Sequence, residues 1–302
     1  MNKNAILQIL VVTLCFMFQL IGCTTMQGFK RTFNPDSDPL LKKRALLAPI
    51  VIQMDMDEKS VQQLNSAFHS LIQKDDHLIV QKTDESILSN DEMKTIQFGV
   101  PLGPVLVEKL AASNIDVLVT AVLGPIDIVT EKKGFLFFKN EKSEAIILMM
   151  MSVSDTTTRT VLANHLETEE IRLPMVVPED QETRIKIEDT VFNKALSSIL
   201  DDLVQKTSET LKHRPWMGRL SMTGDQILQI NGGQDIGVFK GSVFEVFRQG
   251  EPIENITGRE QITLGTKVGE IKAVKVMTDY SIAEPISGEG FMDGQIIRIK
   301  RY

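Results

Sequence analysis

Cysteine is nearly absent from this chain, which has two among 302 residues. Cys15 lies inside an apolar N-terminal run that we expect to be removed, so Cys23 would be the single cysteine of the mature protein. One cysteine can form neither an internal disulfide nor a thiolate metal site. A chain of this length can bury a core without such cross-links.

The chain also lacks a basic excess and the common catalytic motifs. Its 40 acidic residues outnumber the 33 lysines and arginines, and no dense basic footprint for nucleic acid is visible. There is no nucleophile elbow, no zinc-protease helix and no phosphate-binding glycine loop. We therefore expect a protein that is not an enzyme, has no catalytic residues and no metal, needs no cofactor and binds no nucleic acid.

What the N-terminus does contain is the pattern of a lipoprotein signal. Lys3 gives a basic flank, residues 5–21 are apolar, and Gly22 stands directly before Cys23. The small glycine gives a signal peptidase access, and the cysteine thiol and amine can then carry fatty-acyl chains such as palmitate. The pattern predicts a signal peptide over residues 1–22 and a lipid anchor at Cys23. The alternatives are an ordinary signal peptide or a membrane span, for which the run is shorter than the roughly 20 residues required.

Residues 23–43 read as a lipid-anchored linker, because they contain glycine, asparagine, prolines and aspartates and show little periodicity. Thr24 stands where an aspartate retains lipoproteins in the inner membrane of enteric bacteria. By this resemblance we expect the periplasmic face of the outer membrane. The basic triplet 42–44 at the end of the linker is interpreted as a solvated flank or, alternatively, as a contact with anionic lipid.

Residues 44–213 predict an α/β domain whose elements follow the order β-α-β-α-β-β-β-α. Short apolar runs predict strands, and apolar residues at helical spacing predict helices. The expected strands are residues 45–52, 78–80, 115–123, 145–153 and 161–169, and the expected helices are 60–72, 104–113 and 187–211. A turn rich in aspartate and threonine, residues 155–159, should be stabilised by side chains that bond backbone amides.

Residues 214–302 have a different sequence pattern. Glycines recur, and the runs between them alternate apolar and polar residues. Short strands separated by turn signals are typical of a small all-β domain, here expected to be a barrel. The complete mature chain is therefore expected to be α+β, with a domain boundary near residue 214.

The glycine-framed order of this last part resembles the SH3-like C-terminal domain of flagellar assembly protein T. The resemblance is carried by Pro215-Trp216, the pair Gly232-Gly233, residues 241–248 and Asp293-Gly294. Upstream, the chain is similar to curli-secretion-lipoprotein and TolB N-terminal-type domains. That similarity is carried by the strand and helix order, the aromatic run 134–138 and the turn 155–160, where Arg159 replaces an expected glycine.

These resemblances imply binding rather than catalysis. We expect an assembly, anchoring or regulatory factor for an envelope machine such as a flagellar or secretion apparatus. Its partners would be the membrane, through the lipid anchor, and envelope proteins. The alternative is a subunit of an oligomeric outer-membrane secretion pore similar to the curli secretion lipoprotein. Whether the chain forms homo-oligomers is left open by the sequence.

Two groups of residues are candidates for binding. Phe135, Phe137 and Phe138 lie between lysines and either pack back onto their own domain or form an exposed apolar patch for a membrane or a partner. His165, Glu167 and Glu169 alternate along an expected strand and share one face. They could ligate a divalent metal, but we interpret them as a solvated strand face.

Overall fold

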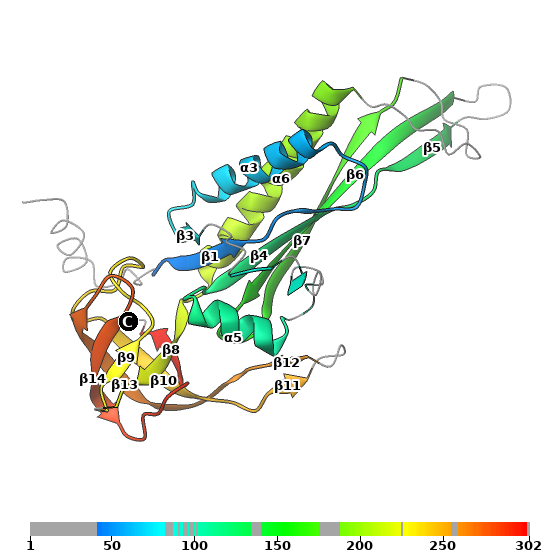
Figure 1. The fold of residues 1–302 in the computed structure, drawn as a ribbon. Coiled ribbons are helices and arrows are strands. Elements are labelled where there is room, and N and C mark those ends of the chain that lie inside the picture. The colour runs from blue at the N-terminus through cyan, green and yellow to red at the C-terminus, as the bar shows by residue number, and fades with distance from the viewer. Residues whose placement is uncertain are drawn as a thin grey trace, which may run out of the picture. The chain divides into compact units, whose positions relative to one another are not determined.

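The computed structural model describes residues 41–81, 87–89, 91–92, 96, 100, 102–133, 140–174, 188–224, 226–254 and 259–300. The chain divides into two compact units, residues 1–39 with 300–302 and residues 40–299. Every helix and strand named below belongs to the second unit (Figure 1). This unit begins with a mixed sheet and its helices and ends with a closed β-barrel.

The sheet contains seven strands in the order β3-β1-β4-β6-β5, with β2 beside β4 and β7 beside β6. These are β1 (Lys43–Leu47), β2 (Val51–Ile52), β3 (Leu78–Gln81), β4 (Val117–Leu123), β5 (Asp127–Lys133), β6 (Asn140–Asp155) and β7 (Val161–Arg172). β1 runs parallel to β3 and β4, whereas β6 is antiparallel to β4, β5 and β7. β1 therefore has a neighbour on each side, and all five of its residues are buried.

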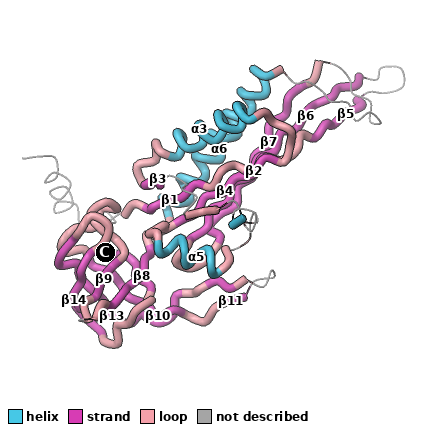
Figure 2. Tube along the Cα trace, viewed as in Figure 1, coloured by secondary structure: helices cyan, strands magenta, loops and turns pink. Residues whose placement is uncertain are grey.

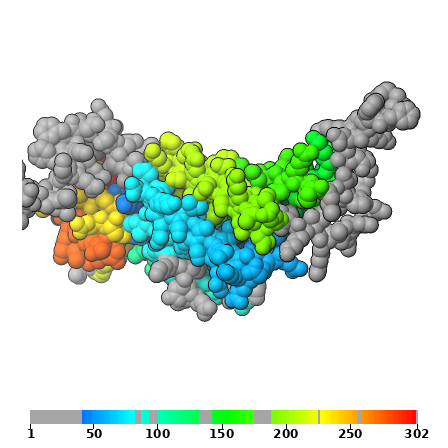
Figure 3. All heavy atoms as spheres, turned by 90° about the horizontal axis from the view of Figure 1, so that it is seen from above, coloured from blue at the N-terminus to red at the C-terminus, as the bar shows by residue number. Residues whose placement is uncertain are grey.

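Helices α3 (Glu58–Ile72) and α6 (Asp189–His213) cover one face of the sheet. α3 begins after Asp57, whose side chain accepts a hydrogen bond from the Ser60 amide at 3.0 Å and so satisfies a free donor of the first turn. The two helices touch each other, and Figure 3 shows them side by side, α3 in blue to cyan and α6 in yellow-green. Their buried side chains and the sheet form one continuous apolar core.

Helix α5 (Pro104–Ala112) packs on the opposite face. Alternate residues of a strand point to opposite faces of a sheet. Leu47 of β1 belongs to the core beneath α3 and α6, while its neighbour Leu46 packs in a separate cluster with Leu106 and Leu110 of α5. β1 is consequently buried from both sides, as its continuous apolar sequence predicts.

The barrel closes through six strands in the order β10-β13-β14-β9-β8-β15. These are β8 (Met217–Met222), β9 (Leu228–Ile230), β10 (Val243–Gln249), β13 (Leu264–Val276), β14 (Ser281–Gly288) and β15 (Ile296–Ile299). The short strands β11 (Ile253–Glu254) and β12 (Glu260–Gln261) pair with each other and, among the described residues, with no other strand. Figure 2 shows strands and loops in this part, and the helices belong to the sheet region.

A tryptophan organises the barrel core. Trp216 is 1% exposed, and its ring meets the edge of Phe244 with 6.0 Å between the ring centroids. The backbone of Gly218 lies so close that an added Cβ would stand 2.2 Å from the indole ring. Leu41, which precedes β1, also belongs to this core.

The expected α+β class and the barrel at the C-terminal end are confirmed. The expected order of elements was incomplete, because the structure adds β2 and β5. The run 45–52 is divided into β1 and β2 around Pro49, which cannot donate a ladder hydrogen bond. β5 was not predicted because its sequence, from Asp127 to Lys133, is largely polar and has no alternating apolar pattern. It pairs with the first half of β6, which is also largely polar.

Candidate interaction site

A groove of about 490 Å³ opens on the barrel. Its walls come from the β8–β9 turn, from β14 and from the loop after β14. The side chains that line it include Met222, Ile227, Ile282, Glu284, Pro285 and Phe291. Most of them are apolar, and Glu284 is the one ionisable side chain among the described lining residues. This volume lies within the roughly 300–1,000 Å³ range of ligand-binding clefts.

The groove exists because two neighbouring strands separate. β9 and β14 pair as far as Leu228 and Ala283, and their ladder ends there. β14 continues to Gly288, and within the described part of the chain this extension pairs with β13 alone. The β8–β9 turn closes on itself instead, since the Thr223 amide donates to the Ile227 carbonyl at 3.1 Å. The space between this turn and β14 is the groove.

A β-bulge shapes the rim of the groove. In the ladder between β13 and β14, Glu270 pairs with Ser287 and Ile271 pairs with Pro285, so Ile286 is an extra residue without a partner in that ladder. Bulges redirect a side chain and tolerate proline. The side chain of Ile286 is accordingly 50% exposed.

Two more large apolar side chains are exposed near the groove. Ile227 is 39% exposed in its wall, and Met292, the residue after Phe291, is 54% exposed. Ile286 and Met292 do not line the groove themselves, but each directly follows a lining residue, Pro285 or Phe291. We call these two residues and Ile227 the apolar rim. Clusters of exposed apolar side chains beside a concave surface are typical of interaction sites.

Three acidic residues lie at or next to the lining of the groove. Glu284 lines the groove, and Glu289 precedes the lining residue Gly290. Asp293 is held beside the groove, because its carboxylate accepts a hydrogen bond from the Met222 amide at 3.1 Å. Two basic residues of β13 lie close in the sheet, since Lys272 pairs with Glu284 and Lys275 pairs with Ile282 in the ladder. The groove therefore offers apolar contact with a predominantly acidic edge.

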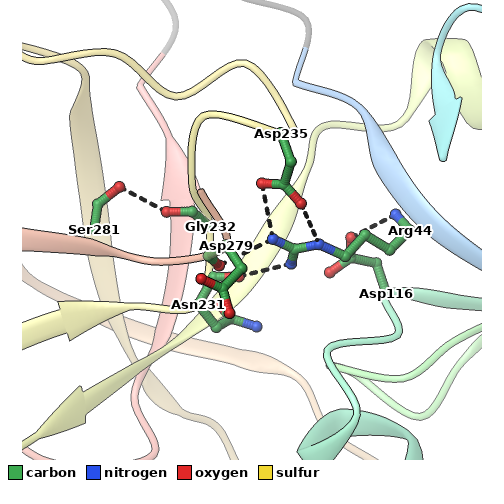
Figure 4. Close-up of polar contacts among 7 residues, drawn as sticks. All are labelled: Arg44, Asp116, Asn231, Gly232, Asp235, Asp279 and Ser281. Atoms are coloured by element: carbon green, nitrogen blue, oxygen red, sulfur yellow. Dashed lines mark hydrogen bonds and ion pairs between the residues drawn. The ribbon is translucent and has the colours of Figure 1, made fainter. Parts of the chain in front are cut away.

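A buried arginine connects β1 to the barrel loops (Figure 4). The Arg44 guanidinium donates from Nε and Nη2 to the carboxylate of Asp235, at 2.9 and 3.1 Å. It also donates to the carbonyls of Asn231 at 2.9 Å and Asp279 at 3.0 Å. Its own amide donates to Asp116 Oδ2 at 2.7 Å. The arginine thus fixes three barrel positions against the centre of the sheet.

The interpretation of residues 42–44 as a solvated flank or a lipid contact was wrong for two of the three residues. Lys43 is 5% exposed and Arg44 is 2% exposed. The Lys43 ammonium donates to the carbonyls of Leu211 and Arg214, at 3.2 and 2.6 Å. The reason is positional, because both residues belong to a strand that is covered on each face.

Two carboxyls lie buried near this contact. Burial raises the pKa of Asp116 to about 7 and also raises the pKa of Asp155 above its ordinary value. Asp155 accepts hydrogen bonds from the amide and hydroxyl of Thr158 at 2.7 and 2.8 Å, which confirms the turn expected from the sequence. Arg159 has a φ of 58°, the left-handed conformation in which a glycine was expected.

The alternating residues of β7 do share one face, but that face is not freely solvated. His165 Nε2 lies 3.2 Å from the hydroxyl of Thr210 on α6, and Glu167 forms an ion pair with Lys206 on the same helix. Glu169 follows on this half-buried face. Among the described residues, no three His, Cys, Asp or Glu side chains form a group that could hold a metal ion.

Four predicted site residues, Cys23, Phe135, Phe137 and Phe138, lie outside the described residues. No helix in the described part of the chain has an apolar stretch long enough to cross a membrane.

The sequence analysis did not find the groove. Its apolar members are scattered over a turn, a strand and a loop, so no periodic pattern connects them. One sequence feature could have indicated the groove. In residues 285–292, a turn that contains glycines is flanked by the apolar residues Pro285, Ile286, Phe291 and Met292. Of these, Phe291 packs against the barrel core, whereas Ile286 and Met292 remain 50% and 54% exposed.

Comparisons with known proteins found no matching family model and no matching curated protein. Among solved structures, the hypothetical protein CT253 from Chlamydia trachomatis is 9% identical, with 57% of this chain and 99% of that chain covered and a TM-score of 0.40. Lipoprotein GNA1162 from Neisseria meningitidis is 9% identical, with 54% and 99% covered and a TM-score of 0.31. The PelC dodecamer from Paraburkholderia phytofirmans is 13% identical, with 59% and 94% covered and a TM-score of 0.31. At this level of identity and superposition, the matches do not establish a shared function.

Proposed function

We propose that this protein is anchored by lipid at Cys23 to the periplasmic face of the outer membrane and acts there by binding another protein. Its role would be assembly, anchoring or regulation of an envelope machine, with a flagellar or secretion apparatus as the first candidates. The observation that carries the proposal is the groove on the barrel with its apolar rim, Ile227, Ile286 and Met292.

The chemistry of the groove favours binding over catalysis. Acid-base or nucleophilic catalysis needs at least two reactive groups within hydrogen-bond reach of each other. The described lining residues offer Glu284 as their single ionisable side chain. Apolar side chains on a fixed barrel instead give contact area at low ordering cost. We therefore propose that the protein has no enzymatic activity.

The proposed location in the envelope rests on the N-terminal sequence, and the proposed binding function rests on the barrel. A closed six-stranded barrel is compatible with the SH3-like domain that the glycine-framed sequence resembles. We propose that residues 214–302 are that domain and that residues 44–213 support it. We also propose Phe135, Phe137 and Phe138 as a second contact, because they lie in the segment that connects β5 to β6.

Site-specific photo-crosslinking in the native envelope tests the proposal. p-Benzoylphenylalanine replaces Ile286 on the apolar rim, and in a matched control it replaces Leu166 of β7, which is 54% exposed against 50% for Ile286. We expect a discrete protein adduct at position 286, weakened by Ile227→Ser in the same chain, and none at position 166. Equal labelling at both positions, or no protein adduct at position 286, would show that the groove is not a protein-binding site.

A further inference from the structure

We infer that the groove binds a short segment of its partner that places a large apolar side chain next to a lysine or arginine. We also infer that contacts of the segment's side chains provide most of the affinity, and that its main chain does not pair with β14 as an added strand. This inference rests on the proposed function, because it names the kind of partner that the same groove would take.

The apolar requirement comes from the lining. Ile227, Ile282 and Phe291 give the groove apolar walls, and Ile286 and Met292 extend this surface outward. A groove of about 490 Å³ has room for more than one side chain. A partner residue that enters it removes its own apolar surface and that of the rim from water, which is the main favourable contribution to binding.

The basic requirement comes from the edge. Glu284, Glu289 and Asp293 supply three carboxylates at or next to the groove, against two lysines of β13, Lys272 and Lys275, so the acidic groups still outnumber the basic ones. A cation beside the anchoring side chain would meet carboxylates on more than one side. An apolar segment that is also acidic would be repelled by the same carboxylates. The acidic edge therefore attracts basic segments and discriminates against acidic ones.

The open edge of β14 argues against strand addition. An added strand needs a regular row of free backbone donors and acceptors. Pro285 has no N–H, the bulge at Ile286 interrupts the regular spacing, and β14 ends at Gly288 with a φ of 85°. Proline and bulges are the devices by which proteins prevent edge pairing.

The same features disfavour the other occupants. A second copy of this chain docked groove to groove would bring two acidic edges into one interface, because an isologous contact uses the same patch of both copies. A bilayer surface rich in anionic lipid would meet the acidic edge with like charge. A basic, apolar peptide segment is the occupant that satisfies both the walls and the edge.

Peptide display on the detergent-solubilised full-length protein tests the inference. Short random peptides are selected against the wild-type chain and against Ile286→Ser. We expect the wild-type selection to enrich an aromatic or large aliphatic residue next to Lys or Arg. Ile286→Ser should weaken the best peptide by about tenfold, because it removes an exposed contact of the rim. Glu284→Gln should weaken it by about threefold and reduce the salt dependence. Leu166→Ser, on β7, should leave it unchanged.

Backbone N-methylation of the selected peptide separates the two binding modes. Methyl groups on alternate amides remove the donors that strand addition needs, but they leave the side chains in place. We expect affinity to fall by less than about threefold if side chains lead. Complete loss of binding on methylation, or enrichment of acidic peptides, overturns the inference.

The outcomes also separate this inference from the proposed function. A protein adduct at position 286 together with selected peptides of a different chemistry overturns the inference and leaves the function. Lack of any protein adduct, with Ile286→Ser reducing vesicle binding or self-association of the chain, overturns both.

Discussion

Replacing Asp235 with asparagine tests the contact that joins β1 to the barrel. The Arg44 side chain is 2% exposed, and its guanidinium donates two charge-assisted hydrogen bonds to Asp235. Asparagine keeps the shape but removes the negative charge, so a buried cation loses its counter-charge. Breaking a buried pair in this way costs about 3–5 kcal/mol. Because the Asp235 side chain is 25% exposed, water compensates in part, and we expect a loss of about 2–3 kcal/mol.

Urea and thermal unfolding of the full-length protein measure this loss. In a chain of this size each kcal/mol lowers Tm by about 2–4 °C, so the expected decrease is about 4–12 °C. Asp279→Ala is the matched control, since Asp279 serves Arg44 through its main-chain carbonyl alone. Its effect should stay within about 0.5 kcal/mol. If Asp235→Asn unfolds like the wild type, or if both variants lose equal stability, the ion pair does not contribute as argued.

The remaining predictions concern a buried acid, a glycine, the lipid anchor and the barrel. Burial raises the pKa of Asp116 from 3.8 to about 7, so its ionisation disfavours the folded state. Urea unfolding of both chains measures how much larger the free energy of unfolding is for the wild type than for Asp116→Asn. This difference should shrink as pH rises from about 4 to about 7 and then stay constant. A difference that does not change with pH would contradict this. Gly218→Ala should cost about 2 kcal/mol, because the new methyl group would overlap the indole ring, whereas Gly224→Ala, with nothing within 4 Å, should be nearly neutral. Cys23→Ala should abolish incorporation of labelled palmitate and normal cleavage, and continued labelling would refute the anchor. Residues 216–302 expressed alone should give dispersed amide NMR signals, and a collapsed spectrum would show that the barrel needs the rest of the chain.

The parts of the fold that the sequence predicts well are those with a strong local pattern. The apolar run at Leu46 and Leu47 predicts a strand buried on both faces, and the structure covers it from both sides. The stripe that includes Leu196, Ile199 and Leu203 predicts a long helix, and these residues are buried on α6. In each case the physical cause is periodic burial within one element, which neighbouring residues alone reveal.

The parts that escaped prediction depend on residues far apart in the chain. Arg44 was interpreted as solvated because a basic triplet is normally exposed, and its acceptor Asp235 is 191 residues away. The groove depends on the point where β9 and β14 separate and on the bulge at Ile286, and neither follows from local periodicity. Registers and long-range ion pairs are decided by tertiary packing, so a single sequence gives little sign of them.

The position of Arg44 has a consequence for the order in which this protein can fold. A chain that is synthesised from its N-terminus delivers β1 early and the acceptors at Asn231, Asp235 and Asp279 late. Until those loops arrive, the Arg44 guanidinium has neither its carboxylate nor its two carbonyl acceptors, so burying this end of β1 would leave an unpaired cation, which is unfavourable. Strand β1, which lies between β3 and β4, therefore reaches its final environment only after almost the whole chain has been made. A chain truncated before the barrel would lack the acceptors of Arg44, and this incompletely satisfied sheet would be a target for proteolysis.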